Sequence, residues 1–178
     1  SVLIGVVLGV LAGYFGGWLD TLVSRATVII LSIPLLLFAI GIVAACSTSK
    51  QGCLNGTLKP GLELVILIIS LFTWPYVARL VRGNTLSVRE REFVEAGRSV
   101  GACNTRIMFR HILPNLLSPL IVYASLLVPA NILFEAYLSF LGLGVPDDQP
   151  SWGSLISDSL SSFDTTWWLW FFPGLFLL

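Results

Sequence analysis

The residues of this sequence whose types could do chemistry gather in one polar stretch, residues 92–119 and the arginines just before it. Between Arg79 and His111 the chain carries seven arginines and three glutamates, whereas the segments on either side are nearly free of charge. We assign no catalytic residue in this stretch, because the pattern favours contact with a soluble partner. We therefore interpret residues 79–113 as a docking loop that the rest of the chain holds in place.

A short helix is predicted inside this loop. Phe93, Ala96, Gly97 and Val100 recur at the spacing of one apolar helix face. Gly101 directly follows Val100 and is suited to end the helix, because glycine takes the left-handed backbone conformation without strain.

A second short helix is expected to follow the first and to run through Met108 to the next apolar segment. Asn104 or Thr105 is expected to cap its beginning, because oxygen-bearing side chains accept hydrogen bonds from the first backbone N–H groups of a helix.

Two uses of the first helix fit its pattern equally well. Its small residues Ala96 and Gly97 would let it sit tightly in a groove of a partner protein. Alternatively, it could lie on lipid headgroups, with its arginines bound to anionic lipid. The spacing of the residues does not separate these two uses.

The composition of the chain is that of a membrane protein. Of its 178 residues, 56% are hydrophobic and 11% charged, and the mean hydropathy is +0.89, whereas soluble domains carry about 25% charged residues. The formal net charge is zero, which gives no indication of a nucleic-acid partner.

We predict an all-α polytopic membrane protein with five transmembrane segments and no β domain. The segments are residues 1–17, 26–48 (with Pro34 inside one helix), 62–78, 112–133 and 167 onward, against about 20 residues for a membrane-spanning helix. The first and last are expected to be incomplete, since the only Met is Met108 and the chain stops within an apolar run.

Glycines recur four residues apart in the first segment, at Gly5, Gly9 and Gly13. This spacing puts small residues on one face, where another helix can approach closely. Glycine is also common in membrane helices in general, so the spacing alone does not require such a contact.

The distribution of Lys and Arg orients the chain, because cytoplasmic loops carry the excess of positive charge. Arg25 and the seven arginines of the docking loop fall on one side of the membrane, and only Lys50 and Lys59 fall on the other. The docking loop 79–113 is therefore predicted to be cytoplasmic, and loops 47–61 and 145–166 to face outward.

Cysteine and histidine usage gives few candidate sites. Cys46 and Cys53 lie seven residues apart in or beside an outward loop, where a disulfide is permitted; two unpaired thiols are the alternative. Cys103 is expected to be reduced. With a single histidine, a zinc site is not expected, and no metal site is assigned.

Glu135 is a further candidate residue, because it is a carboxylate that follows 23 uncharged residues. A carboxylate within a membrane segment is costly and often faces a transport pathway. The alternative, which we favour, is a carboxylate at the outer interface that is hydrogen-bonded locally near Ser139.

The loop resembles the EAA motif of ABC-importer permeases. In this sequence the motif is Glu95-Ala96-Gly97, three residues, Gly101, nine residues and then His111-Ile112-Leu113-Pro114. Gly97 replaces the second alanine of the motif, and His111 stands in place of an isoleucine. The glycine lowers helix propensity by about 1 kcal/mol relative to alanine.

The resemblance extends over almost the whole chain. Residues 138–158 and 13–34 resemble the second permease subunit of dipeptide, oligopeptide and nickel importers. This resemblance implies a single permease domain of the type I ABC-importer fold, with six transmembrane helices in the complete subunit, in a bacterial plasma (inner) membrane.

The resemblance also implies partners. A second, homologous permease subunit would complete a heterodimeric pathway, an extracellular solute-binding protein would deliver the solute, and two ATPase subunits would use ATP-Mg. This chain has no phosphate-binding loop, so it is expected to bind no cofactor and to be no enzyme. The residues expected to contact an ATPase are Phe93, Glu95, Ala96, Gly97, Val100, Gly101, Leu113 and Pro114.

Peptides are the expected solutes, with nickel or another small solute as the alternative. A secondary transporter is less favoured, because no repeated halves with paired mid-membrane sites are recognisable.

Overall fold

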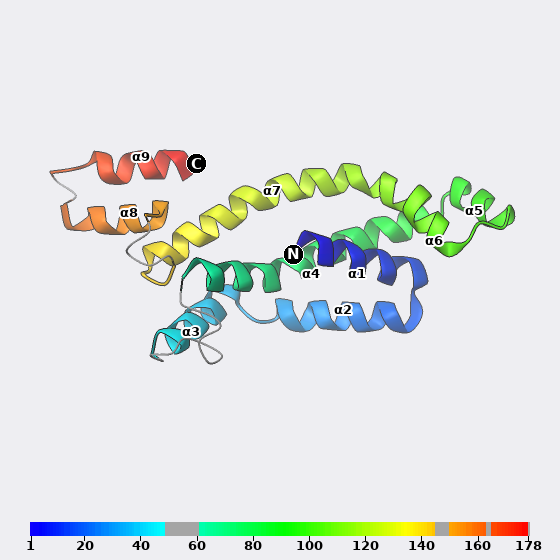
Figure 1. Cartoon of the computed structure of the whole chain (residues 1–178), viewed down its shortest axis with the longest axis horizontal. Helices are drawn as coiled ribbons and strands as arrows, with labels where there is room; N and C mark the ends of the chain where they lie inside the picture. The colour runs from blue at the N-terminus through cyan, green and yellow to red at the C-terminus, as the bar shows by residue number, and fades with distance from the viewer. Residues whose placement is uncertain (49–60, 145–149, 163–164, 178) are drawn as a thin grey trace. The chain divides into compact units, whose positions relative to one another are not determined.

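The structure, a computed structural model, describes residues 1–48, 61–144, 150–162 and 165–177. These residues form helices and connections and contain no strand, so the predicted all-α fold is confirmed. Figure 1 shows the elements, which are α1 (Val2–Phe15), α2 (Gly17–Leu31), α3 (Leu35–Thr48), α4 (Leu62–Arg89), α5 (Glu92–Ser99), α6 (Asn104–Ile107), a π-helical turn (Met108–Ile112), α7 (Leu113–Phe140), α8 (Trp152–Ser159), a 3-10 turn (Leu160–Ser162) and α9 (Trp168–Leu177).

Each of the five predicted membrane segments contains an apolar helix. Among the described residues, two helices are long and apolar enough to cross a membrane on their own: α4 and the continuous run from α6 to the end of α7. Helices α2 and α3 meet the same criterion only when they are taken together as one broken span. Helices α1 and α9 are shorter apolar helices.

The prediction of one unbroken helix over residues 26–48 is wrong, because α2 ends at Leu31 and α3 begins at Leu35. Proline has no backbone N–H, and its ring clashes with the carbonyl group four residues earlier in a helix. Ahead of Pro34 the chain tightens, as the N–H of Ile33 bonds the carbonyl of Ile30 at 3.2 Å. The carbonyl of Pro34 then accepts the first bond of α3, from the N–H of Phe38 at 3.1 Å.

The helices fall into two compact units. The first contains residues 1–33 and 70–126, and the second contains residues 34–69 and 127–178. The single permease domain expected from the sequence stays a prediction.

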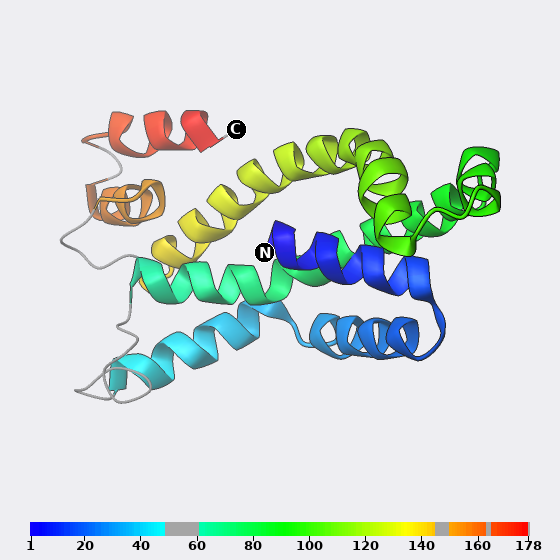
Figure 2. The same cartoon turned by 45° about the vertical axis from the view of Figure 1, so that its right-hand side comes forward.

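In the first unit, α1 packs directly against the backbone of α4 through its row of glycines. A Cβ atom added at Gly9 would lie 2.7 Å from the carbonyl oxygen of Ala78, and one at Gly13 would lie 2.7 Å from Cβ of Thr85. Gly5 occupies the same face one turn earlier. Figures 1 and 2 show α1 lying alongside both α2 and α4. Of the two interpretations that the glycine spacing left open, the close helix approach is the one observed.

An ion pair joins α2 to α4 in the same unit. The Nη2 of Arg82 donates to Oδ2 of Asp20 at 2.7 Å, and its Nε donates to Oδ1 of the same carboxylate. This two-pronged geometry is the strongest arrangement for a guanidinium and a carboxylate. Together with the glycine contacts, it holds α1, α2 and the second half of α4 as one packed group.

In the second unit, the predicted outward loop 145–166 contains a helix, α8, which no sequence pattern indicated; that this segment faces outward stays a prediction. Ser151 caps α8: its Oγ accepts from the N–H of Ser154 at 3.1 Å, and Ser154 Oγ accepts from the N–H of Ser151 at 3.1 Å. Gly153 lies so close to α7 that an added Cβ would overlap the carbonyl oxygen of Ala136. Residues 145–149 and 163–164 lie outside the described ranges.

Candidate functional site

Most of the predicted docking loop 79–113 is helical. Helix α4 continues to Arg89, and only a short turn separates it from α5. The side chains of Val81, Thr85 and Val88 are buried in this extension, while Arg79 and Gly83 on other faces are exposed. The spacing of the buried residues is helical and could have been recognised in the sequence, but the arginines between them favoured a loop.

Helix α5 turns one apolar residue inward and leaves others uncovered. Val94 is fully buried, whereas Phe93 is 37% exposed and Val100 is 89% exposed. Ala96 is also exposed, and Gly97 is half-buried. Of the face predicted from the sequence, Ala96 and Val100 are therefore exposed, whereas Phe93 and Gly97 are partly covered. Val94, which that pattern missed, is the fully buried residue of α5.

Gly101 ends α5 as predicted. Its φ is +82°, its N–H bonds the carbonyl of Arg98 at 2.9 Å, and the N–H of Ala102 bonds the carbonyl of Gly97 at 3.0 Å. These two bonds make a Schellman motif, which satisfies carbonyl groups that a helix end otherwise leaves free. A residue with a Cβ atom would be strained at this φ.

The predicted cap of the second helix is wrong. Helix α6 does begin at Asn104, but its N-cap residue is Cys103, and no side chain caps it. The Oδ1 of Asn104 instead accepts a hydrogen bond from the hydroxyl of Tyr14 at 2.8 Å. Cys103 is a free, exposed thiol, and the backbone N–H of Thr105 lowers its pKa from the usual value.

A π-helical turn over Met108–Ile112 precedes the last residues of the motif. The N–H of Leu113 bonds the carbonyl of Met108, five residues earlier. Pro114 has no N–H to give to the carbonyl of Arg110, so the wider turn forms where the ordinary helical ladder is interrupted. Leu113 is half-buried and Pro114 is exposed at the start of α7.

The turn brings the two halves of the motif together. The rings of Phe93 and His111 lie 6.3 Å apart between centroids, and a Cβ atom added at Gly97 would lie 4.0 Å from Nε2 of His111. Within the structure, α5 is thus held beside the beginning of the long run that becomes α7.

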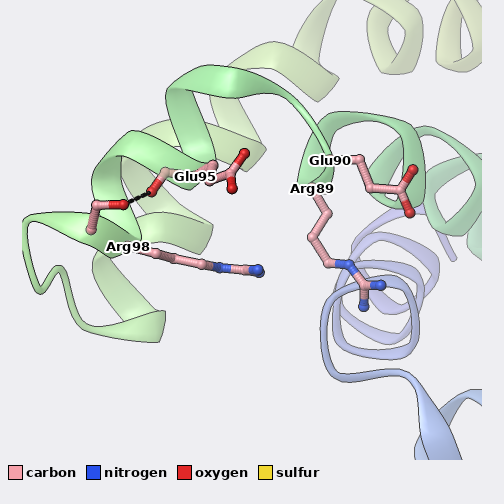
Figure 3. Close-up of a pocket in the computed structure, with 5 residues that line it drawn as sticks. Arg89, Glu90, Glu95 and Arg98 are labelled. Carbon is pink, nitrogen blue, oxygen red and sulfur yellow. Dashed lines mark hydrogen bonds between the residues drawn. The ribbon is translucent and has the colours of Figure 1, made fainter.

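A polar cavity of about 730 Å³ lies between the end of α4 and α5. Figure 3 shows Arg98 extending from α5 toward Arg89, with Glu90 and Glu95 on the same part of the chain. Ser99 completes the lining, and its hydroxyl donates to the backbone carbonyl of Glu95 at 3.1 Å. Two arginines and two glutamates can accept charged side chains of either sign from a partner.

The remaining candidate residues lie elsewhere. Glu135 is half-buried on α7, and its Oε1 accepts from the hydroxyl of Ser139 at 2.7 Å, which is the local bond we favoured; a role facing a pathway stays a prediction. Cys46 is buried at the end of α3. Cys53 lies outside the described residues, so its pairing with Cys46 also stays a prediction.

The sequence of the chain is similar to those of known transport proteins. The family model "Binding-protein-dependent transport system inner membrane component" matches residues 5–178. The oligopeptide transport system permease protein OppC of Haemophilus influenzae is 40% identical over 177 residues, which cover 99% of this chain and 53% of that protein. The dipeptide transport system permease protein DppC of Alkalihalophilus pseudofirmus is 41% identical over 174 residues, covering 98% and 53%.

A third relative is the glutathione transport system permease protein GsiD of Pectobacterium atrosepticum, 37% identical over 161 residues that cover 90% of this chain and 50% of that protein. The chain thus spans about half the length of the curated relatives that it matches. Its family match runs through both units of the structure and includes the whole of α5. The chain therefore belongs to the family of binding-protein-dependent transport system inner membrane components.

Proposed function

We propose that this chain forms the membrane-spanning part of a permease subunit in an ATP-driven importer of peptides. The family is one of inner-membrane transport components, and two of the relatives named above are oligopeptide and dipeptide permeases. These names support peptides over nickel as the solute. The bacterial plasma membrane is the proposed location.

The observation that carries the proposal is the placement of α5. This helix lies between the end of α4 and the beginning of the α6–α7 run, the two helices long enough to span a membrane alone. A partner that moved α5 would act on both spans at once. Its exposed residues Ala96 and Val100 leave a surface with which α5 can sit in a groove of an ATPase subunit.

The proposed complex contains two ATPase subunits, a second permease subunit and an extracellular solute-binding protein. ATP binding would draw the ATPases together and displace α5, and the displacement would shift the pathway between its two access states. This chain would bind no nucleotide, and the hydrolytic chemistry would belong to the ATPases. The predicted contact residues, with Glu95 at the cavity, are proposed as the ATPase surface.

A bulky substitution on the exposed surface of α5 tests the docking. We expect Ala96→Trp to reduce the ATPase that co-purifies with the membrane subunits by at least about tenfold, equivalent to about 1.4 kcal/mol, with unchanged insertion into the membrane. Ala130→Trp is the matched control, because Ala130 is equally exposed on α7 in the second unit. Full recovery of the ATPase with Ala96→Trp would contradict the proposal.

The energy source tests the function itself. Uptake of a peptide into vesicles that contain the complete complex should require ATP and should survive collapse of the ion gradient. Uptake that continues without the ATPases but stops when the gradient collapses would instead identify a secondary transporter.

A further inference from the structure

Tyr14 lies in the last turn of α1 and is only 6% exposed, although its side chain ends in a hydroxyl group. A buried tyrosine hydroxyl needs a hydrogen-bond partner. Each polar or aromatic part of this residue meets a different element of the first unit, and all of these elements belong to the region around α5.

The hydroxyl reaches the beginning of α6. It donates to Oδ1 of Asn104 at 2.8 Å, across 90 positions of sequence. Asn104 is the first residue of α6 and follows the N-cap residue Cys103, and α6 has no side-chain cap. Its side chain is used for the contact with α1 instead.

The aromatic ring reaches α5. The guanidinium carbon of Arg98 lies 5.6 Å from the centroid of the Tyr14 ring, within the range of a cation–π contact. Arg98 is also one of the residues that line the polar cavity. The ring of Tyr14 therefore lies against a charged side chain of the docking region.

The backbone carbonyl of Tyr14 reaches the end of α4. It accepts from Nη1 of Arg89 at 3.0 Å, and the carbonyl of Gly13 lies 3.5 Å from the same nitrogen. The last carbonyl groups of a helix have no partner within it and attract a positive charge. Arg89 fills this role for α1, and it lines the cavity opposite Arg98.

From these contacts we propose that Tyr14 is the positioning residue that fixes the docking helix α5 to α1, so that movement of α5 passes into the membrane helices. The hydroxyl of Tyr14 contacts α6, its ring contacts α5 and its backbone carbonyl contacts the end of α4, so all three helices meet at the end of α1. Helix α1 in turn is packed closely against α4, because its glycines contact the α4 backbone. This inference rests on the proposed function, since it assigns to Tyr14 a part in coupling.

A tyrosine that served packing alone would affect only the amount of folded protein. A positioning residue would also change the yield of transport from each ATP hydrolysed. The test therefore measures peptide transported per ATP hydrolysed by the complete complex in proteoliposomes, together with the amount of ATPase that co-purifies.

Tyr14→Phe removes the bond to Asn104 and keeps the ring. We expect transport per ATP to fall about fivefold, the effect of losing one hydrogen bond, with unchanged co-purification. Asn104→Ala should cause the same loss, and the double variant should be no worse than either single variant, because both remove one interaction. Tyr14→Leu also removes the ring and should lower the ratio by about tenfold or more.

Tyr76→Leu is the control, because Tyr76 is an exposed tyrosine on α4 in the same unit; its ratio should match the wild type. A wild-type ratio of transport to ATP hydrolysed in both Tyr14→Phe and Asn104→Ala would overturn the role of Tyr14 and leave the proposed function intact. Additive losses in the double variant would overturn it in the same way. If the unsubstituted complex shows no ATP-dependent uptake, the proposed function fails and the role of Tyr14 fails with it.

Discussion

Helices α5 and α8 are of equal length, eight residues each, but they are held in different ways. Helix α8 has a reciprocal serine cap at its beginning, and Gly153 brings it against the α7 backbone. Helix α5 has no side-chain cap and is held by Val94, by the ring contact of Phe93 with His111 and by Arg98. Close backbone contact holds α8, whereas side-chain contacts hold α5, and this difference is what the proposed movement of α5 requires.

The glycine helix ends, in contrast, are built alike in the two regions. Gly142 follows α7 with φ +73°, and the N–H groups of Gly142 and Leu143 bond the carbonyls of Ser139 and Leu138 at 3.0 and 2.9 Å. This is the arrangement found at Gly101 after α5. The chain therefore uses one type of helix end in two settings, ahead of the tightly packed α8 and after α5.

The largest expected difference comes from replacing one glycine by alanine in α8 and, for comparison, one in α5. Gly153→Ala should destabilise the protein by about 3 kcal/mol, because the new Cβ would overlap the Ala136 carbonyl and the backbones must separate. Gly97→Ala should be neutral or stabilise α5 by up to about 1 kcal/mol, because only His111 Nε2 lies within 4.0 Å and alanine favours a helix. Thermal unfolding of the purified complex compares the two. Equal losses of stability in the two variants would show that α5 and α8 are packed equally tightly.

A second pair compares the two glycine helix ends. Gly101→Ala and Gly142→Ala should each cost about 1–2 kcal/mol of strain, because both positions have a positive φ. Only Gly101→Ala should also lower ATPase co-purification, since it alters the end of α5. Urea unfolding and co-purification are measured on both variants. Loss of the ATPase from Gly142→Ala to the same extent would mean that α5 is not the specific docking element.

A third pair of variants removes the side-chain N-cap of α8 and adds one to α5. Ser151→Ala should cost about 1 kcal/mol, because the first N–H groups of α8 lose their side-chain acceptor. Arg91→Ser gives α5 the oxygen it lacks at its N-cap and should stabilise it by about 0.5 kcal/mol. Amide hydrogen exchange should slow in α5 and accelerate in α8. Faster exchange in α5 with Arg91→Ser would show that Arg91 itself stabilises the helix.

The smallest expected effect is on the thiol after α5. The backbone N–H of Thr105 lowers the pKa of Cys103 from its usual 9.0, so a larger fraction is thiolate at any pH below that value. Maleimide labelling of Cys103 should therefore reach half its maximal rate at a lower pH in the folded complex than in urea. An equal or higher midpoint in the folded complex would show that the N–H groups of α6 do not act on the thiol.

Features set by local backbone geometry could be predicted from the sequence. The glycine row at Gly5, Gly9 and Gly13 indicated a close helix contact, and Gly101 was identified as the end of α5. Both predictions depend on what a missing Cβ permits at the glycine itself, although the partner of the glycine row, α4, was not predicted.

Features set by tertiary contacts could not be predicted in this way. Proline is one example: Pro34 separates two helices, whereas Pro75 lies inside α4, and the outcome depends on which neighbours satisfy the freed carbonyl group. The partner of Asn104 is another, because Tyr14 is 90 positions away. Helix α8 was not predicted because its capping box has serine at both positions. This is a weaker sequence signal than serine followed three residues later by glutamate.

The central claim is that α5 docks on an ATPase subunit and follows its movement. The most direct measurement places a single cysteine at the exposed tip of α5, Val100→Cys, in the complete complex with the native cysteines replaced. Crosslinking to the ATPase is measured with and without ATP, and Asp158→Cys on the exposed surface of α8 is the control. We predict a crosslink from position 100 alone, whose yield changes with ATP. No crosslink from position 100 in a complex that still transports peptide would contradict the account and would leave α5 as a helix on the lipid surface.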